Sequence, residues 1–581
     1  MKNNIFKTLF LLIAGFISGI IFFITFIIFL LLFTFSFNKQ PVPKISNSWL
    51  LLDYSGKISE KPVAKGPFSF TLSNKNLYLL DYLNAIENAA YDDRIKGIII
   101  NGDLTNYSKV HIEEINNSLM KFKRSGKDII AWFSQADINN YILCTSADKI
   151  YMPDTDSADL TLKGYSQEIP YLKKGLDKLG LDFNVIHIGN YKGTGENLIL
   201  DSMSNELKES YTSIIKNLNK TNFEQISKAR NIEISKLESL VNSGATILMN
   251  PDTALKYGFL DNKLSYEELV DSISKNKDFQ SISIYNYNEL QRKKESKNKI
   301  ALICADGMIT NFYSTSNINQ DTIGAKSFIR DLNKFKKAKN VKAVIIRVNS
   351  PGGSALASEL ISQAITDLKK IKPVYVSFGT VAASGGYYIS CNADRIFTSP
   401  STITGSIGVV SILMNFEEIY KKYGINYEII KEYKYDDFLS SARKPFPEEL
   451  EILKNSMLLT YNEFTDLVMK NRKINNNDIS KIAEGRVWTG MQSLDKKLTD
   501  QTGGIIDTIE YAAITNKLDS YLVVSYPKPE DFFSRISKMS NIKYNIELLN
   551  NKYLKNIIQL SLFCKDNNNK PAYLFPFFDI P

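Results

Sequence analysis

The chain contains the same long stretch of sequence twice, about 246 residues apart. "DDRIKGIIINGD" (92–103) parallels "AKNVKAVIIRVN" (338–349), and "WFSQADINNYILCTSADKIYMP" (132–153) parallels "SFGTVAASGGYYISCNADRIFTSP" (377–400). A repeat of this length constrains the fold strongly, because each copy must form an equivalent structure. We therefore predict two homologous domains, 46–290 and 298–520, joined by a charged linker around "QRKKESKNK" (291–299).

Short apolar runs alternate with helical patterns inside each copy. "AVIIRV" (343–348) is uniformly apolar and β-branched, as expected for a strand covered on both faces. Residues 355–371 follow with helical spacing, "PVYVSF" (373–378) is a second strand, and another helix begins near 384. This order predicts right-handed strand–helix–strand units and a largely parallel sheet, which places the chain in the α/β class.

The amino-terminal segment 8–37 has neither a charged residue nor a proline. Its length exceeds the roughly 20 residues that a helix needs to cross a bilayer, and a cleaved signal peptide has a shorter apolar core. We predict one transmembrane helix within 1–45 that stays in the mature protein. Lysines flank it on both sides, so charge does not settle its orientation. An amino end in the cytoplasm would put the remaining chain outside.

Composition excludes several other kinds of function. The net charge of +9 is spread thinly over 581 residues, which predicts no nucleic-acid surface. No GxxxxGK[ST] or HExxH motif is present, so we expect no cofactor and no metal. The sequence contains no CxxC pair, so it indicates neither a zinc site nor a disulfide framework. The four widely spaced cysteines are Cys144, Cys304, Cys391 and Cys564.

Two loops in the second copy carry the residues for acyl-transfer chemistry. "NSPGGS" (349–354) and "AASGG" (382–386) each follow a predicted strand and precede a helix. Ser384 would lie at a helix start as a nucleophile, while small neighbours let a peptide backbone approach. The backbone N–H groups of Gly352, Gly353 and Gly385 are candidates to hold the negatively charged oxygen that forms on the attacked carbonyl.

The first copy lacks these residues. Ile138 aligns with Ser384, and Asn106-Tyr107 aligns with Gly352-Gly353. A serine at a helix start is often only a cap, but a turn needed for folding alone would be expected in both copies. The comparison therefore favours a chemical function for the second copy.

The base that would activate Ser384 is not identified by residue type. The two histidines, His111 and His187, both lie in the first copy, where each is compatible with a purely structural position. A lysine can replace histidine as the base when burial lowers its pKa. The chain has many lysines, so composition does not select one.

The combination of "VNSPGGS", "GTVAASGGYYISCNADRI" and "STITGSIGV" resembles the S49 serine peptidases, the signal peptide peptidase A family, in its long, duplicated, membrane-anchored form. This resemblance implies two tandem ClpP/crotonase-like domains and a catalytic Ser-Lys dyad. It assigns the nucleophile to Ser384 and the base to Lys192, in "GNYKGTGENLILDSMSNE" (189–206) of the first copy. It also assigns Ser406, in "TGSIG", to hydrogen-bond the lysine. The second copy contains another Tyr-Lys pair, Tyr433-Lys434, so Lys434 is the alternative candidate for the base.

The same resemblance implies a substrate and a location. Substrates would be signal peptides and other apolar peptides, cut by an endopeptidase at the bacterial inner membrane, with the catalytic part on the periplasmic side. Four subunits would assemble. Two other interpretations stay open, a crotonase-like acyl-CoA enzyme and an inactive membrane scaffold. The role of the carboxyl-terminal tail, 521–581, is also open.

Overall fold

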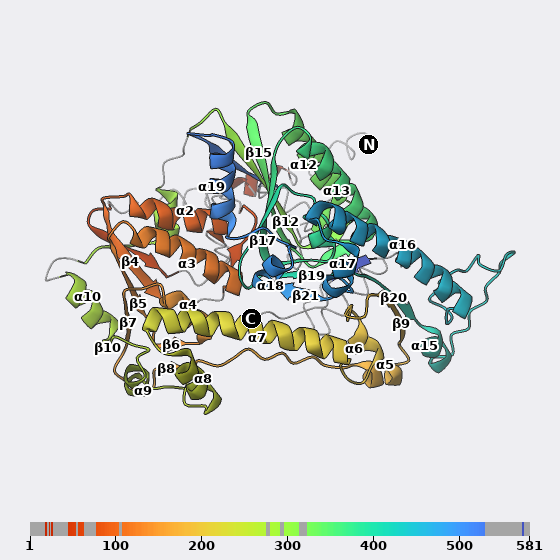
Figure 1. The fold of residues 1–581 in the computed structure, drawn as a ribbon, viewed down its shortest axis with the longest axis horizontal. Helices are drawn as coiled ribbons and strands as arrows, with labels where there is room; N and C mark the ends of the chain where they lie inside the picture. Colours follow the sequence, from red (N-terminus) through yellow and green to blue (C-terminus); the bar gives the residue numbers. More distant parts are fainter. Residues whose placement is uncertain are drawn as a thin grey trace, which may run out of the picture.

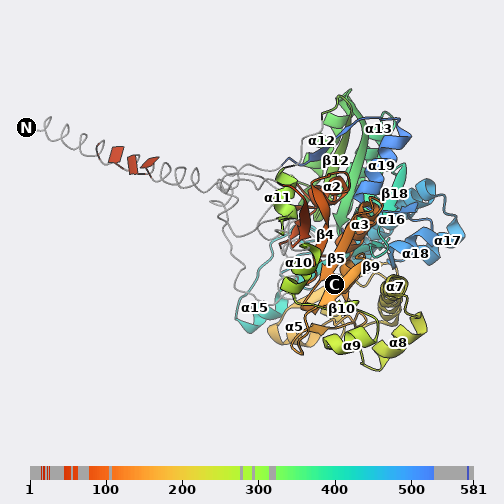
Figure 2. The same cartoon turned by 90° about the vertical axis from the view of Figure 1, so that its left-hand side faces the viewer.

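The computed structural model describes most of the chain. Described are residues 45–53, 56–62, 77–103, 107–274, 279–290, 295–312 and 322–528, the backbone of 572–574, and scattered helical positions between 15 and 26. Figure 1 shows two α/β halves, with the long helix α7 (Asn205–Arg230) running along the lower edge. The turned view in Figure 2 shows the strands of both halves covered by helices. The α/β prediction is confirmed.

The first half begins with parallel strands and ends with a cluster of helices. Its remaining elements are β1 (Ser48–Leu52), β2 (Ile58–Ser59), β3 (Leu77–Tyr78), α2 (Leu79–Ala90), β4 (Ile95–Asn101), α3 (Lys109–Lys123), β5 (Asp128–Trp132), β6 (Gln135–Ala136), α4 (Ile138–Cys144), β7 (Lys149–Met152), β8 (Asp159–Leu160), α5 (Lys173–Leu179), β9 (Asp182–Ile188), α6 (Glu196–Ile199), α8 (Ile234–Asn242), α9 (Pro251–Lys256), β10 (Asn262–Lys263), α10 (Tyr266–Ser274), β11 (Ser281–Ser283) and α11 (Ile284–Glu289).

The second half follows nearly the same order. Its elements are β12 (Lys299–Asp306), β13 (Met308–Thr310), β14 (Thr322–Gly324), α12 (Ala325–Lys337), β15 (Val341–Ser350), β16 (Gly352–Ser354), α13 (Ala355–Lys369), β17 (Val374–Ala383), α14 (Gly385–Tyr388), β18 (Arg395–Thr398), β19 (Ile403–Gly405), β20 (Val409–Asn415), α15 (Glu417–Lys422), α16 (Pro447–Arg472), α17 (Asn476–Ile482), β21 (Val487–Thr489), α18 (Gly490–Asp495), β22 (Gln501–Thr502), α19 (Ile505–Thr515), β23 (Leu522–Tyr526) and β24 (Ala572–Leu574).

Each half has its own sheet. The first has the order β10-β7-β5-β4-β1-β11, and all its pairs are parallel. The second has the order β21-β19-β17-β15-β12-β23, with β18 pairing β17 and only β21 antiparallel to its neighbour. The apolar run of β15 is buried from Ala343 to Val348, because helices cover both faces of the sheet. β23, which lies in the segment we predicted as tail, is the edge strand beside β12.

A third sheet joins the halves. Its order is β14-β13-β16-β24-β20-β9, so β9 of the first half lies beside β20 of the second. Seven residue pairs connect these two antiparallel strands, from Val409↔Ile188 to Asn415↔Asp182. A strand donated by the first half therefore completes a sheet of the second, and this connection positions the site described below.

The predicted membrane helix at 8–37 lies almost wholly outside the described residues. Within the part of the chain that the structure describes, no helix combines the length and the apolar character needed to cross a bilayer.

Candidate active site

Ser384 lies in a strained turn between β17 and α14. Its backbone has φ 54° and ψ −116°, a conformation that residues other than glycine rarely adopt. The Ser384 N–H donates to the carbonyl of Gly405 at 2.8 Å, which fixes the turn to β19. A Cβ on Gly386 would lie 2.6 Å from the carbonyl oxygen of Ser350. The small residues around Ser384 therefore allow its turn to pack against the glycine-rich loop.

The two glycine-containing loops meet beside Ser384. A Cβ on Gly385 would lie 3.1 Å from the Cα of Gly352 and 3.2 Å from the backbone nitrogen of Gly353. Gly385 is the first residue of α14, where backbone N–H groups precede the helical hydrogen-bond ladder. The N–H of Gly352 already donates to the Ser350 hydroxyl at 3.2 Å. The Gly385 N–H is therefore better placed than the Gly352 N–H to donate to an oxyanion.

Lys192 reaches Ser384 from the other half of the molecule. It follows β9, and pairing of β9 with β20 carries it across the boundary between the halves. The Lys192 Nζ lies 2.8 Å from the Ser384 Oγ, 2.9 Å from the Ser406 carbonyl oxygen and 3.0 Å from the Ser406 Oγ. All three side chains are fully buried. The structure thus brings together three residues that the sequence separates by up to 214 positions.

Burial lowers the pKa of Lys192 well below that of an ordinary lysine, because no carboxylate lies close enough to stabilise the ammonium form. A neutral amine has one lone pair and two N–H groups. The lone pair can accept the Ser384 hydroxyl proton while both N–H groups donate to Ser406. Every polar position of the neutral amine then has a partner, and the amine is poised to act as a base.

This lowered pKa predicts the pH dependence of activity. Protonation removes the lone pair of Lys192, so kcat/KM should fall about tenfold per pH unit below the pKa of the buried amine and reach a plateau above it. The midpoint of this acid limb should lie well below 10.5, the ordinary lysine value. Initial rates on a short peptide across the pH range test this. A rate that keeps rising up to pH 10.5 would contradict a desolvated base.

The other candidate bases lie elsewhere. Lys434 is exposed, pairs with Glu448 at 3.5 Å, and has its pKa raised by a hydrogen bond to Tyr435 and by the charge of Glu448. It is therefore a protonated surface lysine in this chain. His111 contacts Glu60 at 3.0 Å rather than the serine. His187 lies on β9, opposite Val410.

A loop that the sequence analysis did not single out holds the site together. The carbonyl of Glu484 accepts from the Tyr191 N–H at 2.7 Å, and the carbonyl of Arg486 accepts from the Ser406 N–H at 2.8 Å. Gly485, with φ 78°, lies between them, and a Cβ there would lie 2.5 Å from the Lys192 backbone nitrogen. This loop therefore clamps the Lys192 and Ser406 segments against each other. In the sequence, Gly485 begins "GRVWTGMQSLDKKLTD" (485–500), which the family resemblance also covers but to which it assigns no role in the site.

We expect Gly485→Ala to lower kcat/KM by about 10²-fold, since a shift of about 1 Å in a catalytic group has effects of this size. The added methyl would displace the Lys192 backbone. Gly424→Ala is the matched control, because Gly424 is also left-handed, with φ 68°, and has no atom within 4 Å of the added carbon. Both variants carry similar backbone strain, so equal activities in a peptide-cleavage assay would contradict the clamp.

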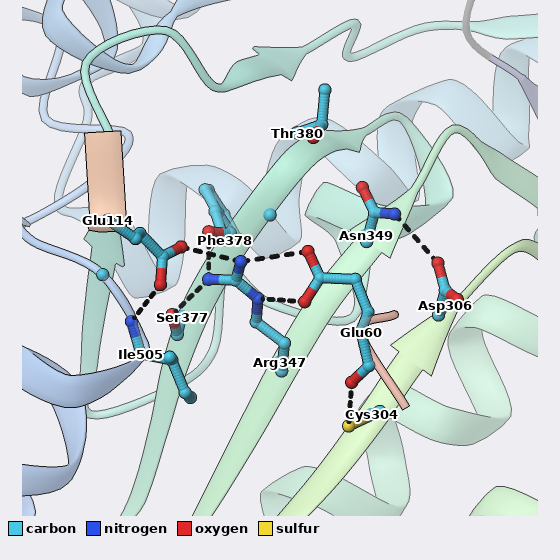
Figure 3. A network of polar contacts seen from close by, with 12 residues as sticks. Glu60, Glu114, Cys304, Asp306, Arg347, Asn349, Ser377, Phe378, Thr380 and Ile505 are labelled. Carbon is cyan, nitrogen blue, oxygen red and sulfur yellow. Dashed lines mark hydrogen bonds and ion pairs between the residues drawn. The ribbon is translucent and has the colours of Figure 1, made fainter. Parts of the chain in front are cut away.

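A buried ionic network joins the two halves, as Figure 3 shows. Arg347, on the strand that leads to the glycine loop, pairs with Glu60 at 2.9 Å and with Glu114 at 2.7 Å, both from the first half. It also donates to the Ser377 hydroxyl and to the Phe378 carbonyl on β17. Burial alone would raise the pKa of the Glu60 carboxyl, but the Arg347 charge and a hydrogen bond from His111 hold it well below its usual range. The network fixes β15 and β17 relative to the first half.

A strand from the tail lies next to the glycine loop. β24 pairs antiparallel with β16, with Gly352↔Leu574, Gly353↔Tyr573 and Ser354↔Ala572 in register. On its other side Ala572 pairs with Val410 of β20. The chain's own strand β24 therefore fills the place between β16 and β20. Among the described residues no cluster of His, Cys, Asp and Glu is arranged to hold a metal ion.

Comparisons with known proteins find relatives of this chain among peptidases. The family model described as peptidase family S49 matches residues 121–280 and 366–519. Protease 4 from Salmonella typhi is 33% identical over 501 residues, which cover 81% of this chain and 79% of that protein. The chloroplastic serine protease SPPA from Arabidopsis thaliana is 30% identical over 451 residues, covering 76% of this chain and 66% of that protein.

Two further matches are shorter. A putative signal peptide peptidase SppA from Enterococcus faecium is 32% identical over 232 residues, covering 40% of this chain and 67% of that protein. Among solved structures, a mutant ClpP1 from Listeria monocytogenes is 15% identical and covers 36% of this chain and 94% of that chain, with a TM-score of 0.25.

Proposed function

Since this chain belongs to peptidase family S49 and is a serine endopeptidase, we propose that it cuts apolar peptides with a Ser-Lys dyad formed by Ser384 and Lys192. The observation that carries this proposal is the 2.8 Å contact between the Lys192 amine and the Ser384 hydroxyl in a fully buried site. The two groups come from different halves of the chain, which gives the first half a function although it lacks a nucleophile.

The proposed reaction has two stages. In the first, the Ser384 Oγ attacks the scissile carbonyl carbon and Lys192 takes the hydroxyl proton, while backbone N–H groups near Gly385 hold the oxyanion. Lys192 then gives this proton to the leaving amine, and an acyl-enzyme remains. In the second stage, Lys192 takes a proton from water as the water oxygen attacks the ester carbon. The bond between that carbon and the Ser384 Oγ then breaks, Lys192 returns the proton to the Oγ, and the new carboxyl end of the peptide is released. Ser406 keeps the amine directed at Ser384 throughout.

We propose that substrates bind as an added β-strand. The place that β24 occupies between β16 and β20 supports this, because a peptide that displaces β24 would pair with backbone on both sides and would need no particular polar side chain. Pairing through backbone alone accepts extended segments without polar side chains, apolar ones included. Signal peptides and other apolar peptides left in the membrane are the substrate class that we propose.

The location follows from the same proposal. We propose that residues 8–37 anchor the chain in the bacterial inner membrane, with the catalytic part on the periplasmic side. Proteinase K added to intact spheroplasts should then digest the catalytic part. Digestion that requires lysis of the spheroplasts would contradict this orientation.

The substrate proposal is tested on the full chain in detergent. Two synthetic peptides of equal length are compared, one with an uninterrupted apolar core and one with two aspartates placed in that core. We expect cleavage inside the apolar core of the first and slow or no cleavage of the second. Preferred cleavage of the aspartate-containing peptide, or no cleavage of either by a folded chain, would overturn the proposal.

A further inference from the structure

Positive charge is concentrated on α12 and the turn that follows it. Seven lysines and arginines but only one acidic residue, Asp331, lie between the start of this helix and the second residue of β15 (325–342). This short segment has a net charge of +6, compared with +9 for all 581 residues. The charge is therefore less evenly spread than we expected from the sequence. The basic residues are Lys326, Arg330, Lys334, Lys336, Lys337, Lys339 and Lys342.

Four of these cations form one stripe along α12. Lys326, Arg330, Lys334 and Lys337 are three or four residues apart, so they lie on the same face of the helix, and all four are exposed. A helix dipole favours cations near the carboxyl end only. Lys326 lies in the first turn, where α12 has no acidic residue. The dipole therefore accounts for the end of the stripe but not for its beginning.

Carboxylates in the described part of the chain neutralise little of this stripe. Asp331 contacts Arg330 at 3.2 Å and Lys334 at 2.9 Å, so one buried carboxylate serves two cations. Glu359, on the neighbouring helix α13, is directed towards α14, because it accepts a hydrogen bond from the Tyr388 hydroxyl. The stripe thus keeps a net positive charge that faces solvent.

A groove with an apolar floor runs beside the stripe. Its volume is about 650 Å³, which is within the range of sites that hold small molecules. Ala325 and Ile329 of α12 and Leu360 of α13 line it together with the four cations of the stripe. One side of a bound molecule would meet methyl groups, while the other would meet ammonium and guanidinium groups. A ligand of matching chemistry is anionic and amphiphilic.

Exposed apolar side chains continue from this groove towards the glycine-rich loop. Leu360 and Leu356 are one turn apart on α13 and are 42% and 54% exposed. Phe312 is 60% exposed, and its carbonyl accepts from the Lys326 N–H at 3.3 Å, so it lies at the amino end of the stripe. Leu356 is two residues beyond Ser354, the last residue of β16. The surface therefore adjoins the strand with which we propose that substrates pair.

We propose that the groove between α12 and α13 binds the headgroup of an anionic phospholipid, and that this contact docks the catalytic part on the bilayer surface. The cations of the stripe would contact the lipid phosphate. Leu356, Leu360 and Phe312 would enter the interface beside the acyl chains. The affinity of a protein surface for a bilayer depends on the buried apolar area and on the attraction of basic residues to anionic lipids, and this surface supplies both.

Two observations favour a lipid over a soluble anion. A soluble anion would not cover the exposed leucines, whereas acyl chains would. The same chain also contains the apolar segment 8–37, and a catalytic part tethered by such an anchor meets lipid at a high effective concentration. The consequence for catalysis rests on the proposed function, because docking would hold β16 close to apolar peptides that remain in the membrane.

The first test asks whether this surface enters a bilayer. A polarity-sensitive maleimide dye is attached to Leu360→Cys in the full chain with Cys564→Ser, because the other cysteines are buried. The matched control carries the dye at Ile234→Cys on α8, which lies at the bottom of both views while α12 and α13 lie at the top (Figures 1 and 2). Both chains are placed in nanodiscs.

We expect a blue shift of the dye at position 360 in discs with about one-third phosphatidylglycerol, and a much smaller shift in discs of phosphatidylcholine alone. The dye at position 234 should respond to neither. Glycerol phosphate in solution should not replace the phosphatidylglycerol. Equal shifts in both discs, a shift at position 234, or a shift caused by soluble glycerol phosphate would overturn docking on anionic lipid.

The second test removes charge from the stripe. Three lysines of the stripe are replaced together by glutamine, and Arg330 is kept because it pairs with the buried Asp331. One lysine near an anionic surface strengthens binding about fivefold, so the docking equilibrium read from the dye should weaken about 10²-fold. A control variant that removes three charges from α7 and α8 should dock normally, and equal docking of the two variants would overturn the proposal. The stripe variant is Lys326→Gln, Lys334→Gln and Lys337→Gln, and the control is Lys216→Gln, Lys228→Gln and Lys236→Gln.

Peptidase activity distinguishes this inference from the proposed function. The stripe variant should cleave a short water-soluble peptide at the wild-type rate, because its substitutions lie outside the contacts of Ser384 and Lys192. It should cleave an apolar peptide inserted in anionic discs more slowly than the control variant does. Equal rates on the inserted peptide would contradict a role of docking in substrate access. A wild type that docks but cleaves neither peptide would contradict the proposed function and not the docking.

Discussion

Replacing Ser384 by alanine should lower kcat on the order of 10⁶-fold, as removal of the nucleophile does in other serine peptidases. The substitution removes one oxygen from a fully buried position and leaves the left-handed turn at φ 54° intact. Thermal unfolding should therefore change little. The measurement is single-turnover cleavage of a peptide by the purified full chain, together with its unfolding temperature.

Ser390→Ala is the matched control for this variant. Ser390 is also fully buried in the same half, and its hydroxyl donates to the Gly386 carbonyl at 2.6 Å, within the turn that follows Ser384. Its loss removes a structural hydrogen bond but no reacting atom. A loss of activity in Ser390→Ala as large as in Ser384→Ala would mean that the assay reports the integrity of the turn and not a nucleophile.

Replacing Lys192 by methionine should lower kcat by roughly 10⁴- to 10⁶-fold, because Ser384 then has no base. Stability should stay the same or rise, since an apolar side chain of similar length replaces an amine whose charged form is strongly disfavoured by burial. This opposite movement of activity and stability distinguishes a catalytic lysine from a structural one. Activity and unfolding temperature falling together would contradict the assignment.

Lys109→Met provides the matched control for the lysine. Lys109 is also almost fully buried in the first half, burial lowers its pKa to about 8, and its amine has no hydrogen-bond partner in the structure. The chemical change is identical, but the residue does not contact Ser384. We expect near-normal activity. The double variant Ser384→Ala with Lys192→Met should be no slower than Ser384→Ala alone, because the two residues act as one unit.

Local sequence patterns predicted the scaffold of the site well. The run at 343–348 lies inside β15, and the helix expected at 355–371 is α13, Ala355–Lys369. These elements are predicted by the spacing of apolar residues, which can be recognised within a short stretch of sequence. The helix expected from 384 is shorter than its pattern suggested, because α14 ends at Tyr388 and the chain continues in turns.

The residues that surround Ser384 could not be predicted from local sequence, because they come from parts of the chain that are distant in sequence. Lys192 lies 192 positions away and reaches the serine only because β9 crosses to β20, so the sequence identified it through resemblance alone. Gly485 was missed because its importance comes from the Lys192 backbone packed against it.

The most direct test of the dyad is labelling of the purified full chain with a fluorophosphonate, followed by mass spectrometry of its peptides. Attack on phosphorus requires an activated serine, so the account predicts an adduct on Ser384 in the wild type and in Lys109→Met, and none in Lys192→Met. An adduct that persists on Ser384 in Lys192→Met, or that disappears only in Lys434→Met, would contradict a base supplied by the first half of the same chain.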